Sequence, residues 1–213
     1  MGFARLSLRR IKGMQFHKLC GTGTGEGFSP KPNWGVYTLL ATWPDAETAR
    51  QALENEPFFQ RHRGHATESC TLLMRATSSR GEWSRRQPFE ASGKPSSGPI
   101  AALTRATIKP RILLKFWQHV PNISAMIGTD PNVSFKIGMG EVPWLHQITF
   151  SIWPDERAMA GFARKDGPHA RAIKDVRAGD WFAEELYARF EILDEIGTWE
   201  GTTPLARLAL DAA

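Results

Sequence analysis

The chain is poor in cysteine, with Cys20 and Cys70 as the only two among 213 residues. Two cysteines cannot build the disulfide framework of a small secreted protein, so a reducing cytoplasm fits the composition best. No apolar run approaches the roughly 20 residues that a membrane helix needs, and the first residues lack the apolar core of a signal peptide. We therefore expect a cytoplasmic protein and leave open a peripheral attachment at the inner membrane.

The charges lack a one-sided pattern, although the net charge is +5 and the pI is near 9.5. Lys and Arg are scattered along the chain, and no basic stripe or known nucleic-acid-reading motif occurs. We expect no nucleic-acid partner. Weak attraction to an anionic membrane surface agrees better with a basic protein of this kind.

Several catalytic signatures are absent as well. The sequence has no Gly-x-Ser-x-Gly, no His-Glu-x-x-His and no Cys/His cluster with zinc spacing. The glycine-rich stretch at 21–27 does not have the glycine spacing of the dinucleotide-binding fingerprint. It is better explained as a flexible hairpin or as a loop at the rim of a pocket.

Aromatic residues, by contrast, are plentiful: the chain has 8 tryptophans and 12 phenylalanines. They indicate a bulky core or a pocket for a large flat or greasy ligand. Only two tyrosines occur, Tyr37 and Tyr187, and both fall within predicted strands. We expect them in the core rather than in catalysis.

An internal repeat is marked by Trp43-Pro44-Asp45 and Trp153-Pro154-Asp155. Each copy follows a stretch rich in β-branched and aromatic residues, which predicts a strand. Pro ends the strand in both copies, and Asp is a candidate N-cap for the helix that follows. A Gly and a Trp also recur near the end of a later strand, as Gly81 with Trp83 and as Gly197 with Trp199.

The second half reads as βαββαβ, the element order of the ferredoxin-like fold. Its predicted elements are a strand at 102–108, a helix from Pro110 to about 120, strands at 133–138 and 146–153, a helix from Asp155 to about 178 that Pro168 interrupts, and a strand at 186–194. We predict an α+β protein with two such repeats in tandem, at 1–84 and 100–199, a linker at 85–99 and a tail at 200–213. Two repeats side by side can close their sheets into one dimeric α/β barrel.

The first half is too short for a complete repeat. Only fifteen residues precede Phe16, whereas some 35 separate the linker from its counterpart Phe135. We therefore predict that the first repeat lacks its first strand and that the chain begins inside the first helix of that repeat. Such a gap leaves an unpaired sheet edge, which usually needs covering.

Among the six histidines, His169 differs most between the repeats. It follows Pro168 where a new helical stretch begins, and the matching place in the first repeat carries Phe58. A metal ligand in one copy and an apolar residue in the other is what one functional site in a duplicated scaffold would look like. A neutral imidazole is a good iron ligand. From spacing alone, a helix-start histidine that faces water explains His169 equally well.

Two other histidines begin predicted strands, His17 and His146. Because side chains alternate along a strand, His146 shares a face with Ile148, Phe150 and Ile152 and points at an apolar layer.

Long segments of the chain, in order, resemble the spheroidene monooxygenase family of carotenoid biosynthesis in purple photosynthetic bacteria. They are 21–28, 40–50, 102–108, 135–138, 141–143, 150–155, 167–173 and 181–190. The similarity covers nearly the whole chain except the linker and the tail. Members of the family begin further upstream with a strand and a helix, in agreement with the short first repeat.

The resemblance implies a haem-dependent monooxygenase that uses O2 and reduced ferredoxin to oxidise an allylic methylene of spheroidene to the ketone of spheroidenone. The cofactor would be haem b, held by a helical histidine as in the paired ferredoxin-like barrels of chlorite dismutases and dye-decolorising peroxidases. His169 is then the expected iron ligand, with His146 and His17 as alternatives. Trp144 and Phe150 are expected to line the pocket.

Two other functions stay open at this point. One is a haem or small-ligand binding module without oxygenase activity. The other is a haem enzyme of the same fold that acts on another substrate, such as an aldoxime or a peroxide. A homo-oligomer stays open too.

Overall fold

The computed structural model describes residues 4–24, 31–118, 130, 132–164 and 179–210. Within these ranges the helices are α1 Ala4–Leu8, α2 Ala46–Asn55, α3 Pro57–His65, α5 Glu156–Arg164 and α7 Pro204–Leu210. The strands are β1 Phe16–Gly23, β2 Pro32–Thr42, β3 Cys70–Gly81, β4 Ile100–Ile108, β5 Phe135–Gly140, β6 His146–Trp153 and β7 Phe182–Gly197. A 3-10 turn, η1 Pro110–Ile112, leads into a helix at 113–118.

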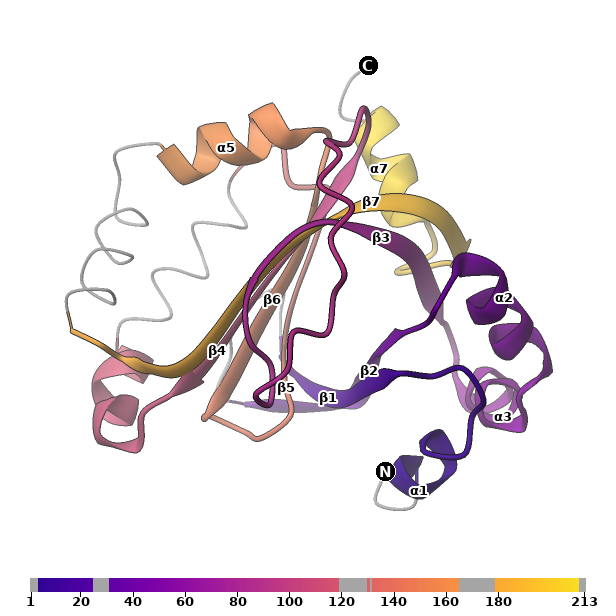
Figure 1. The fold of residues 1–213 in the computed structure, drawn as a ribbon, viewed down its shortest axis with the longest axis horizontal. Coiled ribbons are helices and arrows are strands. Elements are labelled where there is room, and N and C mark those ends of the chain that lie inside the picture. The colour runs from indigo at the N-terminus through magenta and orange to yellow at the C-terminus, as the bar shows by residue number, and fades with distance from the viewer. Residues whose placement is uncertain (1–3, 25–30, 119–129, 131, 165–178, 211–213) are drawn as a thin grey trace.

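The strands form one antiparallel sheet in the order β2-β1-β5-β6-β4-β7-β3. The sheet is strongly curled, so that β3 and β7 arch above β1 and β2 (Figure 1). α2 and α3 lie beside the strands of the first half, and α5 lies on the opposite side of the molecule. The predicted α+β class with a ferredoxin-like layout is confirmed.

The two halves of the chain share this sheet. In the second half the order is β5-β6-β4-β7, in which the first strand of the half lies between the third and the fourth. β1 of the first half pairs with β5 of the second, and β3 of the first half pairs with β7 of the second, so two strand pairings join the halves. β2 and β3 end the sheet, and no other strand of the described ranges pairs with their outer edges.

The main core lies on the concave side of the sheet. Phe16 packs edge-on against Trp83 with ring centroids 5.7 Å apart, and Phe135 packs in the same way against Trp199 at 5.5 Å. The apolar residues that β4, β6 and β7 turn inward complete this core: Ala101, Leu103, Ile148, Phe150, Ile152, Leu186, Ala188 and Phe190. Burying a large side chain of this kind stabilises the fold by roughly 1.5–3 kcal/mol.

Both predicted helix caps are present. Asp45 Oδ1 accepts a hydrogen bond from the backbone N–H of Thr48 at 2.7 Å, and Asp155 Oδ1 accepts one from Ala158 at the same distance. Pro57 begins α3 directly after α2. Proline suits the first turn of a helix because the N–H group that it lacks has no partner within the helix there. The break predicted at Pro168 lies outside the described residues.

The segment predicted as a linker packs against the core. Phe89 contacts Phe190 edge-on with ring centroids 5.0 Å apart, and the N–H of Ser92 donates to the carbonyl of Ala76 at 2.9 Å. The segment therefore covers part of the concave side of the sheet (Figure 1).

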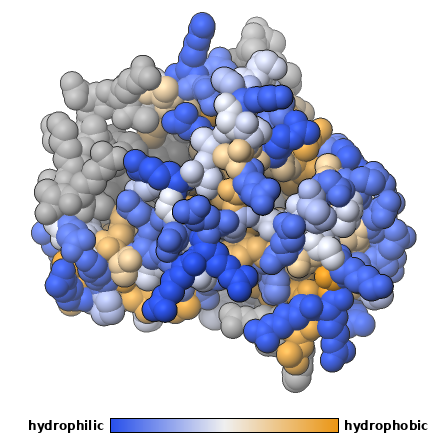
Figure 2. Space-filling model, viewed as in Figure 1, coloured by the Kyte–Doolittle hydropathy of each residue, from blue (hydrophilic) through white to orange (hydrophobic). Residues whose placement is uncertain are grey.

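The position of Tyr37 differs from its expected place in the core. It is 48% exposed, so that expectation is wrong. The physical reason is the face of β2 that it occupies: Val36 and Leu40 pack against the main core, so Tyr37 points to the other side of the strand. Hydrophilic side chains otherwise dominate the face seen in Figure 2, with small apolar patches between them. In the described part of the chain, no helix is long and apolar enough to cross a membrane.

Replacing Gly197 by Ala is expected to destabilise the fold by at least about 3 kcal/mol. Gly197 ends β7 with a φ of +83°, and a Cβ there would overlap the carbonyl oxygen of Ser69. Gly201 is the matched control, because it has a φ of +77° and no atom within 4 Å of an added Cβ. Gly201→Ala should cost only the backbone strain of about 1 kcal/mol. Urea denaturation measures both, and equal losses would contradict the role of the close approach.

Candidate functional site

A large open cavity of about 2250 Å³ lies on the concave side of the sheet. It reaches from the inward faces of β5, β6 and β7 to the edge strands β2 and β3 and to α2 and α3. Among the side chains that line it from the strands, Arg75 and Lys136 are charged, and the apolar ones include Val36, Leu40, Leu72, Met74, Phe135, Phe150 and Phe190. We call this space the interior cavity. Its size and lining suit an elongated apolar ligand better than a small polar one.

Strand alternation explains which side chains face inward. On β1, Lys18 lies between Phe16 and Cys20, both of which belong to the main core. On β4, Arg105 follows Leu103 with the same spacing. Because residues two apart share a face, these charged side chains point into the concave side near one end of the sheet.

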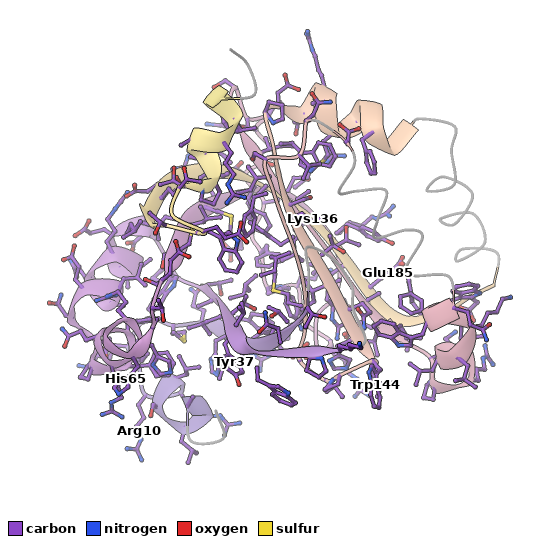
Figure 3. All side chains as sticks on the ribbon, turned by 180° about the vertical axis from the view of Figure 1, so that it is seen from behind. Arg10, Tyr37, His65, Lys136, Trp144 and Glu185 are labelled. Atoms are coloured by element: carbon purple, nitrogen blue, oxygen red, sulfur yellow. The ribbon has the colours of Figure 1, made fainter. Side chains whose placement is uncertain are left out.

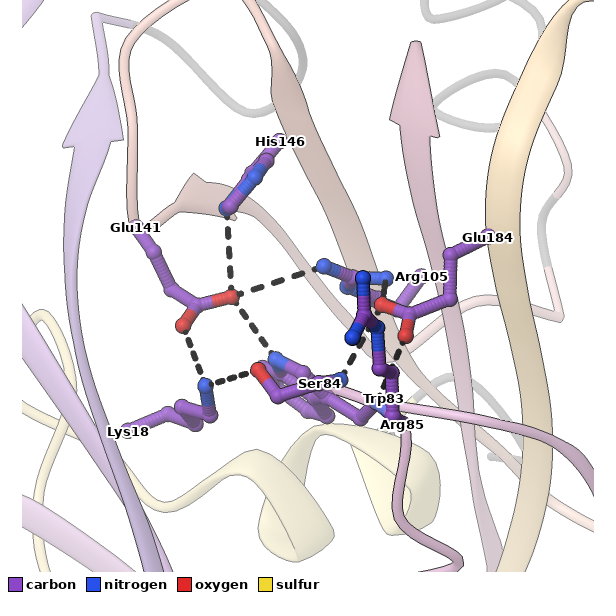
Figure 4. A network of polar contacts seen from close by, with 8 residues as sticks. All are labelled: Lys18, Trp83, Ser84, Arg85, Arg105, Glu141, His146 and Glu184. Atoms are coloured by element: carbon purple, nitrogen blue, oxygen red, sulfur yellow. Dashed lines mark hydrogen bonds and ion pairs between the residues drawn. The ribbon is translucent and has the colours of Figure 1, made fainter.

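Five ionisable side chains and one indole meet there, and we call them the polar cluster: Lys18, Trp83, Arg105, Glu141, His146 and Glu184 (Figure 4). Glu141 is its centre. Its carboxylate lies 2.7 Å from the Lys18 ammonium and accepts a hydrogen bond of 2.7 Å from the Trp83 indole. Nδ1 of His146 lies 3.3 Å from the same carboxylate.

Arg105 connects the two carboxylates of the polar cluster. It pairs with Glu184 directly, and its Nη2 lies 3.8 Å from Glu141. Its side chain is only 2% exposed. Glu184 also accepts hydrogen bonds from the backbone N–H groups of Ser84 and Arg85 at 3.0 and 2.8 Å. The start of the linker is thereby tied to the cluster.

The cluster keeps Glu141 ionised. Burial alone would raise its pKa, but the contacts with His146, Lys18 and Trp83 outweigh burial and lower the pKa to about 2. An ionised carboxylate beside an imidazole fixes the orientation of the ring. This arrangement can hold a metal-ligating histidine in place.

The buried thiol beside the cluster has a different character. Burial, with Glu141 nearby, raises the pKa of Cys20 to about 12. Cys20 therefore stays a neutral thiol at physiological pH and behaves as a small apolar core residue.

The predicted site residues occupy different places. Phe150 lines the interior cavity. His146 faces inward with the apolar residues of β6, as expected, and belongs to the polar cluster. Trp144 lies in the turn after β5 and is 53% exposed. The side chain of His17 points to the opposite face of β1 from those of Phe16 and Lys18. Its pKa is lowered by burial and by the charges of Arg9 and Lys18.

His169 lies outside the described residues, so its role as iron ligand stays a prediction. In the described ranges, no group of three or more His, Cys, Asp or Glu side chains is placed to hold a metal ion.

Sequence reasoning missed four members of the polar cluster: Lys18, Arg105, Glu141 and Glu184. A signal was present for three of them. Lys18, Arg105 and Glu184 each occupy an inward position of a strand whose other inward residues are apolar. A charged residue at such a position is seldom buried without a partner. Glu141 lies in a turn, where no periodicity identifies it.

Comparison with curated proteins gives three relatives named spheroidene monooxygenase. The protein from Cereibacter sphaeroides is 53% identical over 204 residues, which cover 94% of this chain and 63% of that protein. The Rhodobacter capsulatus protein is 49% identical, with 93% and 83% covered. The Rubrivivax gelatinosus protein is 34% identical, with 89% and 73% covered. The chain thus spans less than two thirds of the length of the Cereibacter sphaeroides relative.

Solved structures match only distantly. A candidate monooxygenase from Fusobacterium nucleatum has a TM-score of 0.45 at 10% identity, with 92% of this chain and 85% of that chain covered. One from Lactobacillus acidophilus has a TM-score of 0.39 at 10% identity, with 91% and 90% covered. No family model matches the sequence. The long matches to the three curated proteins nevertheless leave one assignment: this chain belongs to the spheroidene monooxygenase family.

Proposed function

We propose that the protein is a haem-dependent monooxygenase that oxidises an allylic methylene of spheroidene, or of a closely similar carotenoid, to a ketone. The observation that carries this proposal is the interior cavity, which is about 2250 Å³ in volume and combines many apolar and aromatic side chains with charged ones such as Arg61 and Arg75. A long polyene needs such a space, since it offers the protein carbon and hydrogen surface along almost its entire length.

The chemistry requires an external reductant, for which we propose reduced ferredoxin. Two successive oxidations at one carbon each consume one O2, two electrons and two protons, and each releases one water. The resulting gem-diol loses a further water to leave the ketone. Bound haem would supply the oxidation of the C–H bond with O2.

The residues present fit a histidine-held haem at one described place. Nδ1 of His146 is buried, has no partner of good hydrogen-bond geometry and faces the carboxylate of Glu141 at 3.3 Å. Histidine ligands of metals commonly direct their second ring nitrogen at a carboxylate in this way. We keep His169 as the proposed ligand, because it combines a helical position with the difference between the repeats, and His146 is the alternative.

The chain's own side chains would bind the substrate and hold His146 in position. The apolar walls of the interior cavity would bind the polyene and exclude water around it. Glu141 would stay ionised and orient the imidazole of His146 through its Nδ1. Lys18 and Arg105 would hold the two carboxylates of the cluster in place.

The finer fold prediction also belongs to this proposal. We infer that the halves are two copies of one unit that form a barrel open between β2 and β3. The matching pairs Phe16–Trp83 and Phe135–Trp199 support it, and so do the matching caps Asp45 and Asp155.

Incubating the haem-loaded protein with O2, reduced ferredoxin and detergent-solubilised spheroidene should yield a product whose mass is higher by one oxygen and lower by two hydrogens. Mass spectrometry with 18O2 should find the label in the ketone when exchange with water is quenched. Leaving out ferredoxin is the control and should leave the carotenoid unchanged. Bound haem without any carotenoid product would instead favour a binding module or another substrate.

A further inference from the structure

Most of the large apolar side chains that the protein exposes lie at one end of the sheet. The described ranges expose seven of them, and five form what we call the rim patch: Trp34 at 76%, Tyr37 at 48%, Leu114 at 82%, Val142 at 41% and Trp144 at 53%. Of the other two, Leu6 is on α1 and Ile196 is near the end of β7. Leaving two tryptophans and a tyrosine in water is unusual for a soluble surface and marks an interaction site.

Strand register brings the patch residues of β2 close to the turn between β5 and β6. Trp34 follows Asn33, which pairs with Thr22, and Thr22 pairs with Met139. Tyr37 pairs with Gly21, and Gly21 pairs with Gly140 on its other side. Two strand spacings therefore separate Tyr37 from Gly140, about 10 Å in all. Val142 and Trp144 follow Gly140 in the turn between β5 and β6.

A hydrogen bond adds the remaining part of the patch. The Trp117 indole donates to the carbonyl of Trp144 at 3.2 Å and brings the helix at 113–118, which carries Leu114, against this turn. Tyr37 and Trp144 both lie along the lower edge of Figure 3, away from α5 and α7 at the top.

Basic side chains stand beside the rim patch. Lys109, Arg111 and Lys115 precede or lie on the helix that carries Leu114. One carboxylate, that of Asp180, pairs with Lys109 and lies 3.7 Å from Arg111. The Arg111 side chain is 69% exposed, so its charge is available to a partner. Apolar aromatic residues flanked by exposed cations are the composition of surfaces that bind anionic bilayers.

The rim patch also adjoins the interior cavity. Tyr37 belongs to both, because it lines the cavity together with Gly35 and Val36. We propose that the rim patch docks the protein on an anionic lipid surface and that the carotenoid enters the interior cavity from the bilayer beside Tyr37. The choice of a lipid partner rests on the proposed carotenoid substrate, which dissolves in membranes and not in water.

Vesicle flotation tests the docking surface. We expect the haem-loaded protein to float with vesicles of equimolar phosphatidylcholine and phosphatidylglycerol, and to float less with phosphatidylcholine alone. The double variant Trp34→Ser/Leu114→Ser should lower the partition coefficient at least about ten-fold. The matched control is Ile196→Ser, which removes an exposed apolar side chain near the end of β7, at the other end of the sheet, and should bind like the unaltered protein.

Charge is tested separately with Arg111→Gln. Loss of one cation near the membrane should weaken binding to the anionic vesicles roughly five-fold and leave binding to neutral vesicles unchanged. Arg157→Gln on α5, which removes an exposed cation on another side of the molecule, is the control and should have no effect. If Trp34→Ser/Leu114→Ser floats as well as Ile196→Ser, or if both variants lose binding equally, the proposed docking surface is wrong.

A turnover assay separates this proposal from the proposed function. If the rim patch is the docking surface, Trp34→Ser/Leu114→Ser should oxidise solubilised spheroidene at the rate of the unaltered protein. It should oxidise vesicle-borne spheroidene at least about ten-fold more slowly than the unaltered protein does. If the double variant oxidises vesicle-borne spheroidene as fast as solubilised spheroidene, the proposed entry of the carotenoid from the bilayer is wrong. Patch-dependent flotation without turnover of either form would support docking and overturn the proposed activity.

Discussion

Replacing Arg105 by Met should lower the free energy of unfolding by about 3–5 kcal/mol. The Arg105 side chain is 2% exposed and stands between Glu184 and Glu141, whose side chains are 19% and 12% exposed. Met fills a similar volume but cannot neutralise either carboxylate. The carboxylates of Glu141 and Glu184 would then remain largely buried without the cation that they share. Removing one partner of a buried ion pair costs far more free energy than forming the pair contributes.

The control for Arg105→Met is Arg75→Met. Arg75 also pairs with a carboxylate across two strands, at 3.1 Å from Glu191, but the two side chains are 58% and 36% exposed. Exposed pairs contribute about 0–1 kcal/mol, so this substitution should have little effect. Urea denaturation of the apo-protein at neutral pH compares the two. A loss below about 1 kcal/mol for Arg105→Met would show that the polar cluster reorganises or admits water, and that Arg105 is not needed to balance the two carboxylates.

Replacing His169 by Gly should abolish the Soret band of the haem-loaded protein or weaken haem binding more than about 100-fold. Loss of a supporting partner already costs up to that factor, and loss of the ligand itself should cost more. Added imidazole should restore the band, because it can occupy the space left by the missing side chain. Circular dichroism of the apo-protein distinguishes loss of haem from loss of fold.

One further variant makes the ligand test decisive. His146→Ala should keep the band. If His146→Ala loses the band and His169→Gly keeps it, His146 is the ligand and Glu141 is its carboxylate partner. If neither substitution alters haem binding, both assignments are wrong.

The local features of the fold followed from short-range patterns. Strand-forming stretches identified most of β2, β4, β6 and β7, and the Pro-Asp steps placed the caps of α2 and α5. β7 extends from Phe182, four residues before the predicted start, because it pairs with β4 there and is held extended by this neighbour. The exposure of Tyr37 depends on what packs against its face of β2, which is why its place in the core was predicted wrongly.

The sequence by itself determined the α+β class, the repeated Trp-Pro-Asp pattern and the family, because these depend on residue order, periodicity and local capping. Only the tertiary structure decided that Lys18, Arg105, Glu141 and Glu184 meet. Alternation shows which face of a strand a side chain takes, but the register between strands decides what stands opposite it. The 66 positions that separate Lys18 from Ser84, and the 79 that separate Arg105 from Glu184, are bridged only when the curled sheet forms.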